Sequence, residues 1–534
     1  NAAMVLAKPA AMAPRDLAEK LGRLLEEFDE VESADIAGPG FINIHLKLPF
    51  WHQCLGDILD LKNRFGESTI GEGKKVNIEY VSANPTGPLH IGHARGAVFG
   101  DVLASLLTKA GYDVTREYYI NDAGGQVDVL AHSTYMRYCE ALGRDIGAIP
   151  AGLYPGDYLK EIGAALVTKI GDRYFDRPEE DWLDDIRHFA IDRMIQGIKE
   201  DLIALGIHMD VFSSEKSIVK SGSVQRVIEQ LRDAGYLYRG VLEPPKGKEP
   251  ADWEPREQLL FKASDFGDDT DRPLQKSDGS WTYFAADVAY HLDKLERTKG
   301  QLINIFGADH GGYVKRMNAA VAALSGKTGM LDIKLCQLVN LLDNGTPIKM
   351  SKRAGTFITV RDVIDNVGAD VIRFIMLTRR NDQTLDFDFA KVTEQSKDNP
   401  VFYVNYAHAR IVSVLKRAAE LKMWPITGEK DLDKRTTPFI ENELTLVKKL
   451  SEWPNVVKQS AKFHEPHRIA FYLNEVASSF HSLYQSSNAY GQYRFIVEGS
   501  PDLCTTRLAL ANSTQIVIKN GLYLLGIVPL DEMY

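Results

Sequence analysis

The stretch KVNIEYVSANPTGPLHIGHARG, residues 75–96, decides the fold. Residues 75–82 have the composition of a strand, and a loop rich in Gly and Pro follows them. From about residue 90 apolar residues recur at helical spacing, and DVTREYYIND at 113–122 reads as another strand. Strand, turn, helix and strand form a βαβ unit, so we predict an α/β chain built on a parallel sheet. The predicted helical face consists of Ile91, Ala94, Val98, Val102 and Leu106.

The chain of 534 residues is too long for one hydrophobic core, and we predict three domains. Residues 1–73 read as a small α+β domain. Residues 74–394 form a Rossmann-like domain with a mostly helical insertion at about 130–275, after which SWTYFAADVAYHL at 280–292 looks like strand again. Residues 395–534 are helical almost throughout and predict an all-α bundle.

Composition limits the classes of function. The net charge of −10 does not suggest a nucleic-acid binder, although residues 401–534 carry 15 Lys and Arg against 13 Asp and Glu. That local balance leaves open a polyanion partner or ordinary surface variation. No run of about 18 apolar residues predicts a membrane span. The 4 cysteines are scattered without a CxxC pair, which favours a reducing compartment such as the cytoplasm.

Two histidines, His90 and His93, stand at the start of the predicted helix. A zinc site would need a third ligand, and no Glu or Cys lies near in the sequence, so we predict no metal site. A helix N-terminus instead directs free N–H groups at a ligand, and glycines let that ligand approach the backbone. Imidazoles add donors where charge develops at phosphorus. We therefore favour a phosphate site that includes Gly87 and Gly92, with two surface histidines as the alternative.

A basic loop, KMSKRAGT at 349–356, offers a second phosphate-binding element. Lys349 and Lys352 stand three residues apart around Met350 and Ser351, and lysines on a glycine-bearing loop suit the β- and γ-phosphates of a nucleotide. The alternative is a solvated basic loop.

The histidine motif followed by KMSKR resembles the paired motifs of class I aminoacyl-tRNA synthetases. EYVSANPTGPLHIGHARG, YYINDAGGQ, GADHGGYVKRM and NPVFYVNYAHARI resemble, more closely, the bacterial-type arginyl-tRNA synthetases, over nearly the whole chain. The resemblance implies ATP-dependent ligation of L-arginine to tRNA(Arg) through an arginyl-adenylate, with Mg²⁺ sharing the phosphate charge. In this reading the catalytic residues are His90, His93, Lys349 and Lys352, and Gly87, Gly92, Met350 and Ser351 also contact ATP.

The family makes its adenylate only with tRNA bound, and often has a degenerate lysine motif. The intact pair here weakens that expectation. Alternatives within the enzymes are a class I synthetase for another amino acid and, less well matched, a free-standing adenylyltransferase or a metallohydrolase. A non-catalytic tRNA-binding paralogue should have lost the histidines or lysines first. We expect a monomer.

Arginine is a planar cation, so its pocket needs fixed carboxylates. In the strand at 75–82, Asn77 and Glu79 share one face, and a Glu in a buried parallel strand needs a cationic partner. A strand-edge Glu facing water is the alternative. The resemblance implies that the arginine site consists of Glu79, Ser82, Asn84, Tyr283 and Asp287.

The alternative roles for the last two residues are a packing aromatic for Tyr283 and a helix N-cap for Asp287. Asp309 and His310 fall near a polar contact of the family but do not align uniquely.

The resemblance also implies two tRNA-binding regions. The C-terminal bundle should stack anticodon bases on aromatic side chains, and the N-terminal domain should touch the tRNA elbow through Phe41 and Asn43. A β-turn and a core Phe are the alternative for the second region. Candidates in the bundle, each also interpretable as a core residue, are Tyr403, Tyr406, Tyr490, Tyr493 and Tyr523.

Overall fold

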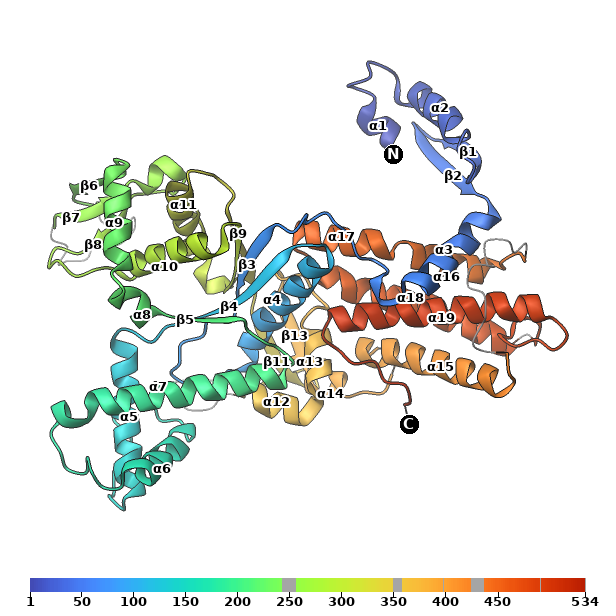
Figure 1. The fold of residues 1–534 in the computed structure, drawn as a ribbon. Helices are drawn as coiled ribbons and strands as arrows, with labels where there is room; N and C mark the ends of the chain where they lie inside the picture. Colours follow the sequence, from blue (N-terminus) through green and yellow to red (C-terminus); the bar gives the residue numbers. More distant parts are fainter. Residues whose placement is uncertain (243–255, 349–357, 397, 424–436, 490, 534) are drawn as a thin grey trace.

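The computed structural model describes residues 1–242, 256–348, 358–396, 398–423, 437–489 and 491–533. A small N-terminal unit projects from the body, a central α/β part follows, and helices form the C-terminal part (Figure 1). In the N-terminal unit two short helices cover one antiparallel strand pair. Its elements are α1 Ala2–Leu6, α2 Pro14–Leu25, β1 Val31–Ala37 and β2 Phe41–Leu46.

A five-stranded parallel sheet forms the centre, which confirms the predicted Rossmann-like α/β fold. Its order is β10-β9-β3-β4-β5, so the first strand of the sheet lies in the middle and the order reverses beside it. Ligands of such sheets bind at that reversal, outside the carboxyl ends of the strands. The strands are β3 Lys75–Glu79, β4 Asp113–Ile120, β5 Val211–Ser214, β9 Gln301–Gly307 and β10 Leu331–Cys336.

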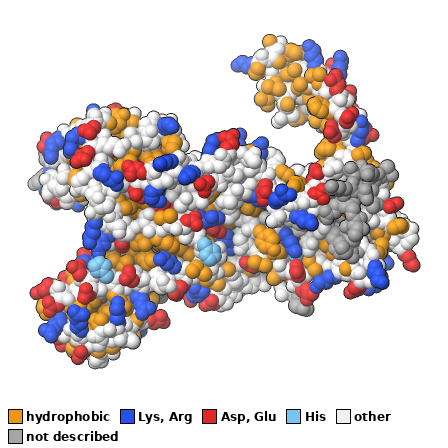
Figure 2. Space-filling model, in the orientation of Figure 1, with side chains coloured by type: hydrophobic (Ala, Val, Ile, Leu, Met, Phe, Trp, Pro, Cys, Tyr) orange, Lys and Arg blue, Asp and Glu red, His pale blue; other side chains and the backbone are white. Residues whose placement is uncertain are grey.

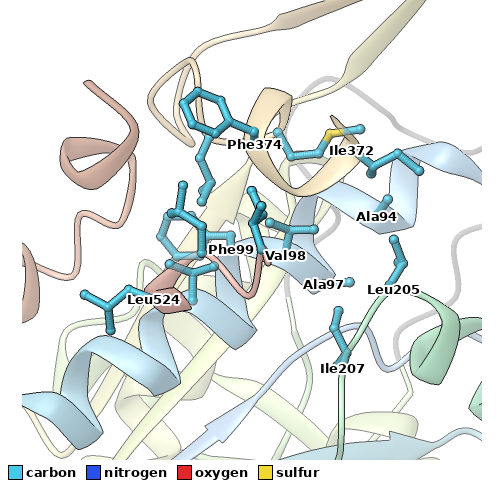
Figure 3. Packing of buried hydrophobic residues seen from close by; sticks show 14 of the residues in the cluster. Ala94, Ala97, Val98, Phe99, Leu205, Ile207, Ile372, Phe374 and Leu524 are labelled. Atoms are coloured by element: carbon cyan, nitrogen blue, oxygen red, sulfur yellow. The ribbon is translucent and has the colours of Figure 1, made fainter. Parts of the chain in front are cut away.

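The helix that follows β3, α4 Ile91–Lys109, is buried on nearly all sides. Figure 3 shows its side chains packed against residues of other segments, at 205–207, at 372–374 and at Leu524. A helix that is apolar all round belongs in a core. The packing of α4 in the core therefore fixes the position of its first turn. The residues labelled in the figure are Ala94, Ala97, Val98, Phe99, Leu205, Ile207, Ile372, Phe374 and Leu524.

Two lobes flank the carboxyl end of the sheet, and Figure 2 shows a recess between them. One lobe is helical: α5 Gly125–Ala141, α6 Tyr158–Ile170 and α7 Glu179–Ala204. The other begins after β5 and joins helices to a small antiparallel sheet, so the region at 130–275 is less helical than we expected. Its elements are α8 Glu215–Lys220, α9 Ser223–Asp233, β6 Leu237–Gly240, β7 Gln258–Phe261 and β8 Arg272–Gln275.

The strand expected at 280–292 is wrong, because this stretch forms most of helix α10, Tyr283–Thr298. Thr282 caps the helix by accepting a hydrogen bond from the N–H of Ala285. Phe284, Val288 and His291 then fall on one buried face at helical spacing. Aromatic and β-branched residues suggested a strand, and tertiary packing overrode that propensity.

The rest of the central part adds a second sheet and further helices. A second sheet has the order β12-β11-β13, built from β11 Val339–Asp343, β12 Thr346–Pro347 and β13 Leu385–Asp388. The remaining helices are α11 Val314–Ser325, α12 Val360–Val367, α13 Ala369–Ile375 and α14 Phe389–Val392.

The C-terminal part is all-α, as predicted. Helix α3 Leu48–Leu61, inside the predicted 1–73 domain, packs against α16 and α19 of this bundle. The exact domain boundaries stay a prediction. No helix in the described ranges is long and apolar enough to cross a membrane. The bundle consists of α15 Pro400–Glu420, α16 Glu441–Ser451, α17 Trp453–Phe463, α18 His467–Ala489 and α19 Pro501–Leu524.

Candidate active site

A strained turn follows β3. Val81 and Ser82 have φ of 70° and 39°, in the left-handed region that non-glycine residues rarely adopt. The turn folds Ser82 back, so that its Oγ donates to Oε1 of Glu79 at 3.0 Å and accepts the N–H of Tyr119 at 3.1 Å. Strain of this kind tends to persist at functional sites, where surrounding contacts enforce it.

The loop after this turn is anchored by hydroxyl groups. Tyr118 Oη donates to the carbonyl of Ala83 at 2.8 Å, and Tyr158 Oη donates to the carbonyl of Thr86 at 2.7 Å. A Cβ at Gly87 would lie 3.4 Å from Tyr158 Oη, so the ring of Tyr158 lies beside this glycine. These two hydrogen bonds therefore fix the course of the loop up to the start of α4.

The two histidines stack at the N-terminus of α4. His90 is the N-cap residue, its backbone N–H donates to Nδ1 of His93 at 3.2 Å, and the ring centroids lie 3.7 Å apart. A Cβ at Gly92 would lie 3.0 Å from Nδ1 and Cε1 of His90, so any side chain there would press on that ring. The structure thus brings together the predicted phosphate-binding residues of this motif at a helix N-terminus.

Buried contacts fix this helix end to the chain segments just before β11 and just after α13. Arg95, which ends the histidine motif, is 1% exposed and donates to the carbonyls of Gln337, Leu338 and Arg380. The strand-like contact His90↔Thr359 adds to this anchor. Chain just C-terminal to the lysine motif therefore lies beside the histidines. Lys349, Met350, Ser351 and Lys352 themselves lie outside the described residues.

Glu79 is buried, at 4% exposure, and the predicted cationic partner is confirmed. Nζ of Lys294, on α10, donates to Oε2 of Glu79 at 2.7 Å, and Lys294 is fully buried. The same ammonium donates to Oδ1 of Asn304, whose Nδ2 lies 2.9 Å from Nε2 of His291. Because Nδ1 of His291 faces the carbonyl of Asp287, which can only accept, Nε2 is the acceptor from Asn304.

A second buried glutamate, Glu117, differs from Glu79 in how fully its oxygens are hydrogen-bonded. Glu117 lies opposite Glu79 in the register of β3 and β4 and is also buried. Its two oxygens accept hydrogen bonds from Asn77, Ser213, Tyr290 and Arg297. Burial raises its pKa, but Arg297, Lys294 and Ser213 together outweigh burial and hold the pKa below the ordinary value. Glu117 is thus saturated. Among the described residues, Oε1 of Glu79 accepts a hydrogen bond from Ser82, and it retains capacity for a further one.

Asp287, on α10, lies close enough to Glu79 for the two charges to interact. Burial, together with the negative charges of Glu215 and Glu79, raises the pKa of its carboxyl to about 7. The hydroxyl of Tyr313 donates to it and, with Arg316, opposes that rise. The N-cap alternative for Asp287 is wrong, because Thr282 is the cap and Asp287 lies in the second turn. A carboxylate with so raised a pKa gains from a cationic ligand.

The remaining predicted residues lie at the rim. Tyr283 is 72% exposed, which excludes the packing alternative, and a Cβ at Gly124 would lie 3.3 Å from its hydroxyl. Asn84 is exposed and donates to Oε1 of Gln126 at 2.9 Å. Both thus adjoin the loop between β4 and α5. Asp309 and His310 are exposed in a 3-10 turn after β9.

Sequence reasoning missed several groups of this pocket. Glu215, the first residue of α8, is 9% exposed, and burial followed by the charge of Asp122 raises its pKa. It follows the capping residue Ser214, so its sequence context indicates an ordinary helix start. Lys294 and Tyr119 also gave no local sign of a role, because each acts through residues distant in the chain.

The predicted tRNA contacts lie away from this pocket. Phe41 and Asn43 are exposed on the N-terminal unit, so the core alternative for Phe41 is wrong. In the bundle, the ring centroids of Tyr403 and His481 lie 4.4 Å apart, and the guanidinium carbon of Arg410 lies 4.0 Å from the centroid of the Tyr406 ring. Their tRNA-binding roles stay predictions. Of the other candidates, Tyr493 is partly buried, Tyr523 is 55% exposed and Tyr490 lies outside the described residues.

No group of three or more His, Cys, Asp or Glu side chains placed to hold a metal ion occurs within the described part of the chain.

Comparison with known proteins now identifies the family. The profile of the "Arginyl tRNA synthetase N terminal domain" matches residues 1–46, that of the "tRNA synthetases class I (R), catalytic domain" matches 55–144, and that of the "DALR anticodon binding domain" matches 404–533. The arginine–tRNA ligase of Ruegeria pomeroyi is 57% identical over 535 residues, covering 100% of this chain and 92% of the relative.

The arginine–tRNA ligase of Roseobacter denitrificans is 57% identical over 536 residues, with the same coverage. Among solved structures, the arginyl-tRNA synthetase of Thermus thermophilus shares the fold with a TM-score of 0.74 at 22% identity, over 99% of this chain and 93% of that one. The buried carboxylate pocket, the paired histidines and these relatives agree: the chain belongs to the arginyl-tRNA synthetases.

Proposed function

We propose that the pocket of Glu79 and Asp287 binds the guanidinium of L-arginine and that the adjoining loop and helix end bind ATP. Family membership gives the overall reaction, the ATP-dependent ligation of arginine to tRNA. The observation that carries the assignment of residues is the pairing of one half-satisfied buried carboxylate, Glu79, with a second, desolvated one, Asp287.

Recognition of arginine follows from the donors that each carboxylate already has. Lys294 occupies Oε2 of Glu79, which leaves Oε1 for the substrate. Asp287 supplies a second anionic acceptor from α10. A guanidinium presents five N–H donors in a planar fork, whereas the ammonium of lysine is a single point charge. Lysine would therefore leave one buried carboxylate unpaired, and the pocket would reject it.

The first step joins arginine to AMP. The carboxylate of arginine attacks the α-phosphorus of ATP, and pyrophosphate leaves. No side chain needs to act as a base, because the nucleophile is already ionised. His90, His93 and the backbone N–H groups beside Gly92 would stabilise the charge that develops at phosphorus. Ser82 and Asn84 would hold the amino-acid backbone, and Tyr283 would cover the pocket from the rim.

The sequence resemblance assigns binding of the leaving phosphates to the lysine motif. Lys349 and Lys352 would bind them, with Gly87, Met350 and Ser351 contacting the nucleotide. Mg²⁺ is commonly bound through substrate phosphates with only one or two protein carboxylates. Bound in that way, it would neutralise phosphate charge without a protein-built cage.

The second step moves the arginyl group to the 3′-terminal ribose of tRNA(Arg), releasing AMP. Phe41 and Asn43 would contact the tRNA elbow, and Tyr403 and Tyr406 the anticodon loop; the exposure of the first two supports this assignment. We further propose that the enzyme acts as a cytoplasmic monomer.

ATP–pyrophosphate exchange tests this function. The chain is assayed with each of the twenty amino acids, with and without tRNA(Arg). Exchange should occur with arginine only, and the dependence on tRNA decides whether the histidines reach working geometry before tRNA binds. Exchange with another amino acid in preference to arginine would overturn the pocket assignment.

A further inference from the structure

Tyr119 carries a buried hydroxyl with no hydrogen-bond partner among the described residues. Its side chain is 5% exposed. The adjacent buried tyrosines are satisfied: Tyr118 donates to the carbonyl of Ala83, and Tyr290 donates to Glu117. In the described part of the chain, no other tyrosine hydroxyl is both buried and unpartnered. Buried polar groups rarely lack a partner, and a role in binding a ligand is one standard reason.

The position of Tyr119 places it beside the carboxylate pocket. It follows Glu117 by two residues on β4, so both side chains stand on the same face of the sheet, the face that α10 covers. Its ring stacks on Tyr290 of α10 with centroids 4.2 Å apart. Its backbone N–H donates to Oγ of Ser82, which in turn donates to Glu79.

The surroundings of this hydroxyl are strongly negative. Burial first, and then the charges of Asp287, Glu215, Glu79 and Asp122, raise the pKa of Tyr119 far above its ordinary value. The phenol is therefore neutral. Glu215 has no ion pair in the described ranges, although it is 9% exposed. The pocket thus contains a neutral hydroxyl and an unpaired acid that do not bond to each other.

A guanidinium would satisfy both groups. It carries five N–H donors, and one hydrogen bond to Oε1 of Glu79 and one to the carboxylate of Asp287 would leave further donors available. A neutral phenol oxygen adds an acceptor without adding negative charge, and its O–H remains able to donate to a pocket carboxylate. We propose that Tyr119 is a substrate-recognition residue whose hydroxyl oxygen accepts a hydrogen bond from the arginine guanidinium. This inference rests on the proposed arginine pocket.

The test compares two single-atom changes. Tyr119→Phe keeps the ring, its stacking and its burial, and removes only the hydroxyl. Loss of a hydrogen bond to a charged group should raise the arginine KM in ATP–pyrophosphate exchange about 10- to 100-fold. The ATP KM and kcat should stay within about twofold, and the melting temperature should not fall, because no contact within the protein is lost.

Tyr472→Phe is the matched control, because it removes a buried tyrosine hydroxyl that donates to the carbonyl of Lys449 in the helical bundle. Its arginine KM should stay near that of the wild type. An unchanged arginine KM in Tyr119→Phe, or an equal rise in both variants, would overturn the role of Tyr119. Pyrophosphate exchange by the wild type with arginine distinguishes failure of this inference from failure of the proposed function. If the wild type shows exchange, such a result rejects only the role of Tyr119. If it shows none, the proposed function itself fails.

Discussion

Replacement of Glu79 by Gln separates the two partners of this carboxylate. In the free enzyme the change removes the negative charge that compensates the fully buried Lys294, and leaves its ammonium with neutral amide oxygens, that of Asn304 among them, as acceptors. Removing one partner of a buried ion pair costs about 3–5 kcal/mol of unfolding free energy. At roughly 2–4 °C per kcal/mol for a domain of about 150–250 residues, the melting temperature should fall by about 6–20 °C, with the larger domain here favouring the lower end.

The same change weakens arginine binding by a different route. Loss of a charge-assisted hydrogen bond at Oε1 should cost about 1.5–3 kcal/mol, or roughly 10- to 150-fold in the dissociation constant. Calorimetry of arginine binding and differential scanning calorimetry measure the two effects separately. The double variant Glu79→Gln/Lys294→Met removes both charges of the pair, so stability should largely return while arginine affinity stays low.

Either of two results would refute this reasoning. A melting temperature unchanged in Glu79→Gln would mean that Lys294 does not depend on the pair. Arginine affinity restored in the double variant would mean that Glu79 acts on the substrate only by keeping the fold intact.

Three further predictions concern the rest of the site. Burial raises the pKa of Asp287 to about 7, so below that pH arginine must displace a proton from its carboxyl, and the affinity for arginine should fall about tenfold per pH unit between pH 7 and 5.5. In calorimetric titrations, Asp287→Asn should show no such pH dependence. An equal pH dependence in the wild type and in Asp287→Asn would contradict the assignment. Gly92→Ala, whose Cβ would lie 3.0 Å from the His90 ring, should lower the rate of adenylate formation about 10- to 100-fold with arginine affinity unchanged, and an unaltered single-turnover rate would argue against the histidines. Lys352→Ala should mainly lower kcat for pyrophosphate exchange; a rise in the ATP KM alone would show uniform binding instead.

The parts of the fold that follow from local pattern were predictable. The strand predicted at 75–82, the helix predicted from about residue 90 and the helical C-terminus follow from local pattern, and the structure has all three, with the strand ending at Glu79 and the helix beginning at Ile91. Helix α10 was missed because its aromatic and β-branched residues favour a strand locally, while its capping residue Thr282 and its buried face favour a helix only once the sheet is present.

The site was predictable only in part, for a related reason. Glu79 was expected to need a cation, but nothing local indicates that Lys294, 215 residues away in the chain, supplies it. The left-handed backbone at Val81 and Ser82 could not be inferred, because neither residue favours it and long-range contacts enforce it. Tyr119 and Glu215 enter the pocket through strand pairing and helix packing, which single-sequence patterns do not specify.

A crystal structure of the enzyme with L-arginine and a non-hydrolysable ATP analogue tests the central claim most directly. The guanidinium should lie within hydrogen-bond distance of Oε1 of Glu79 and of the Asp287 carboxylate, with Lys294 still on Oε2 and the α-phosphate against the N-terminus of α4. A guanidinium bound elsewhere, with Oε1 of Glu79 unoccupied, would contradict the account.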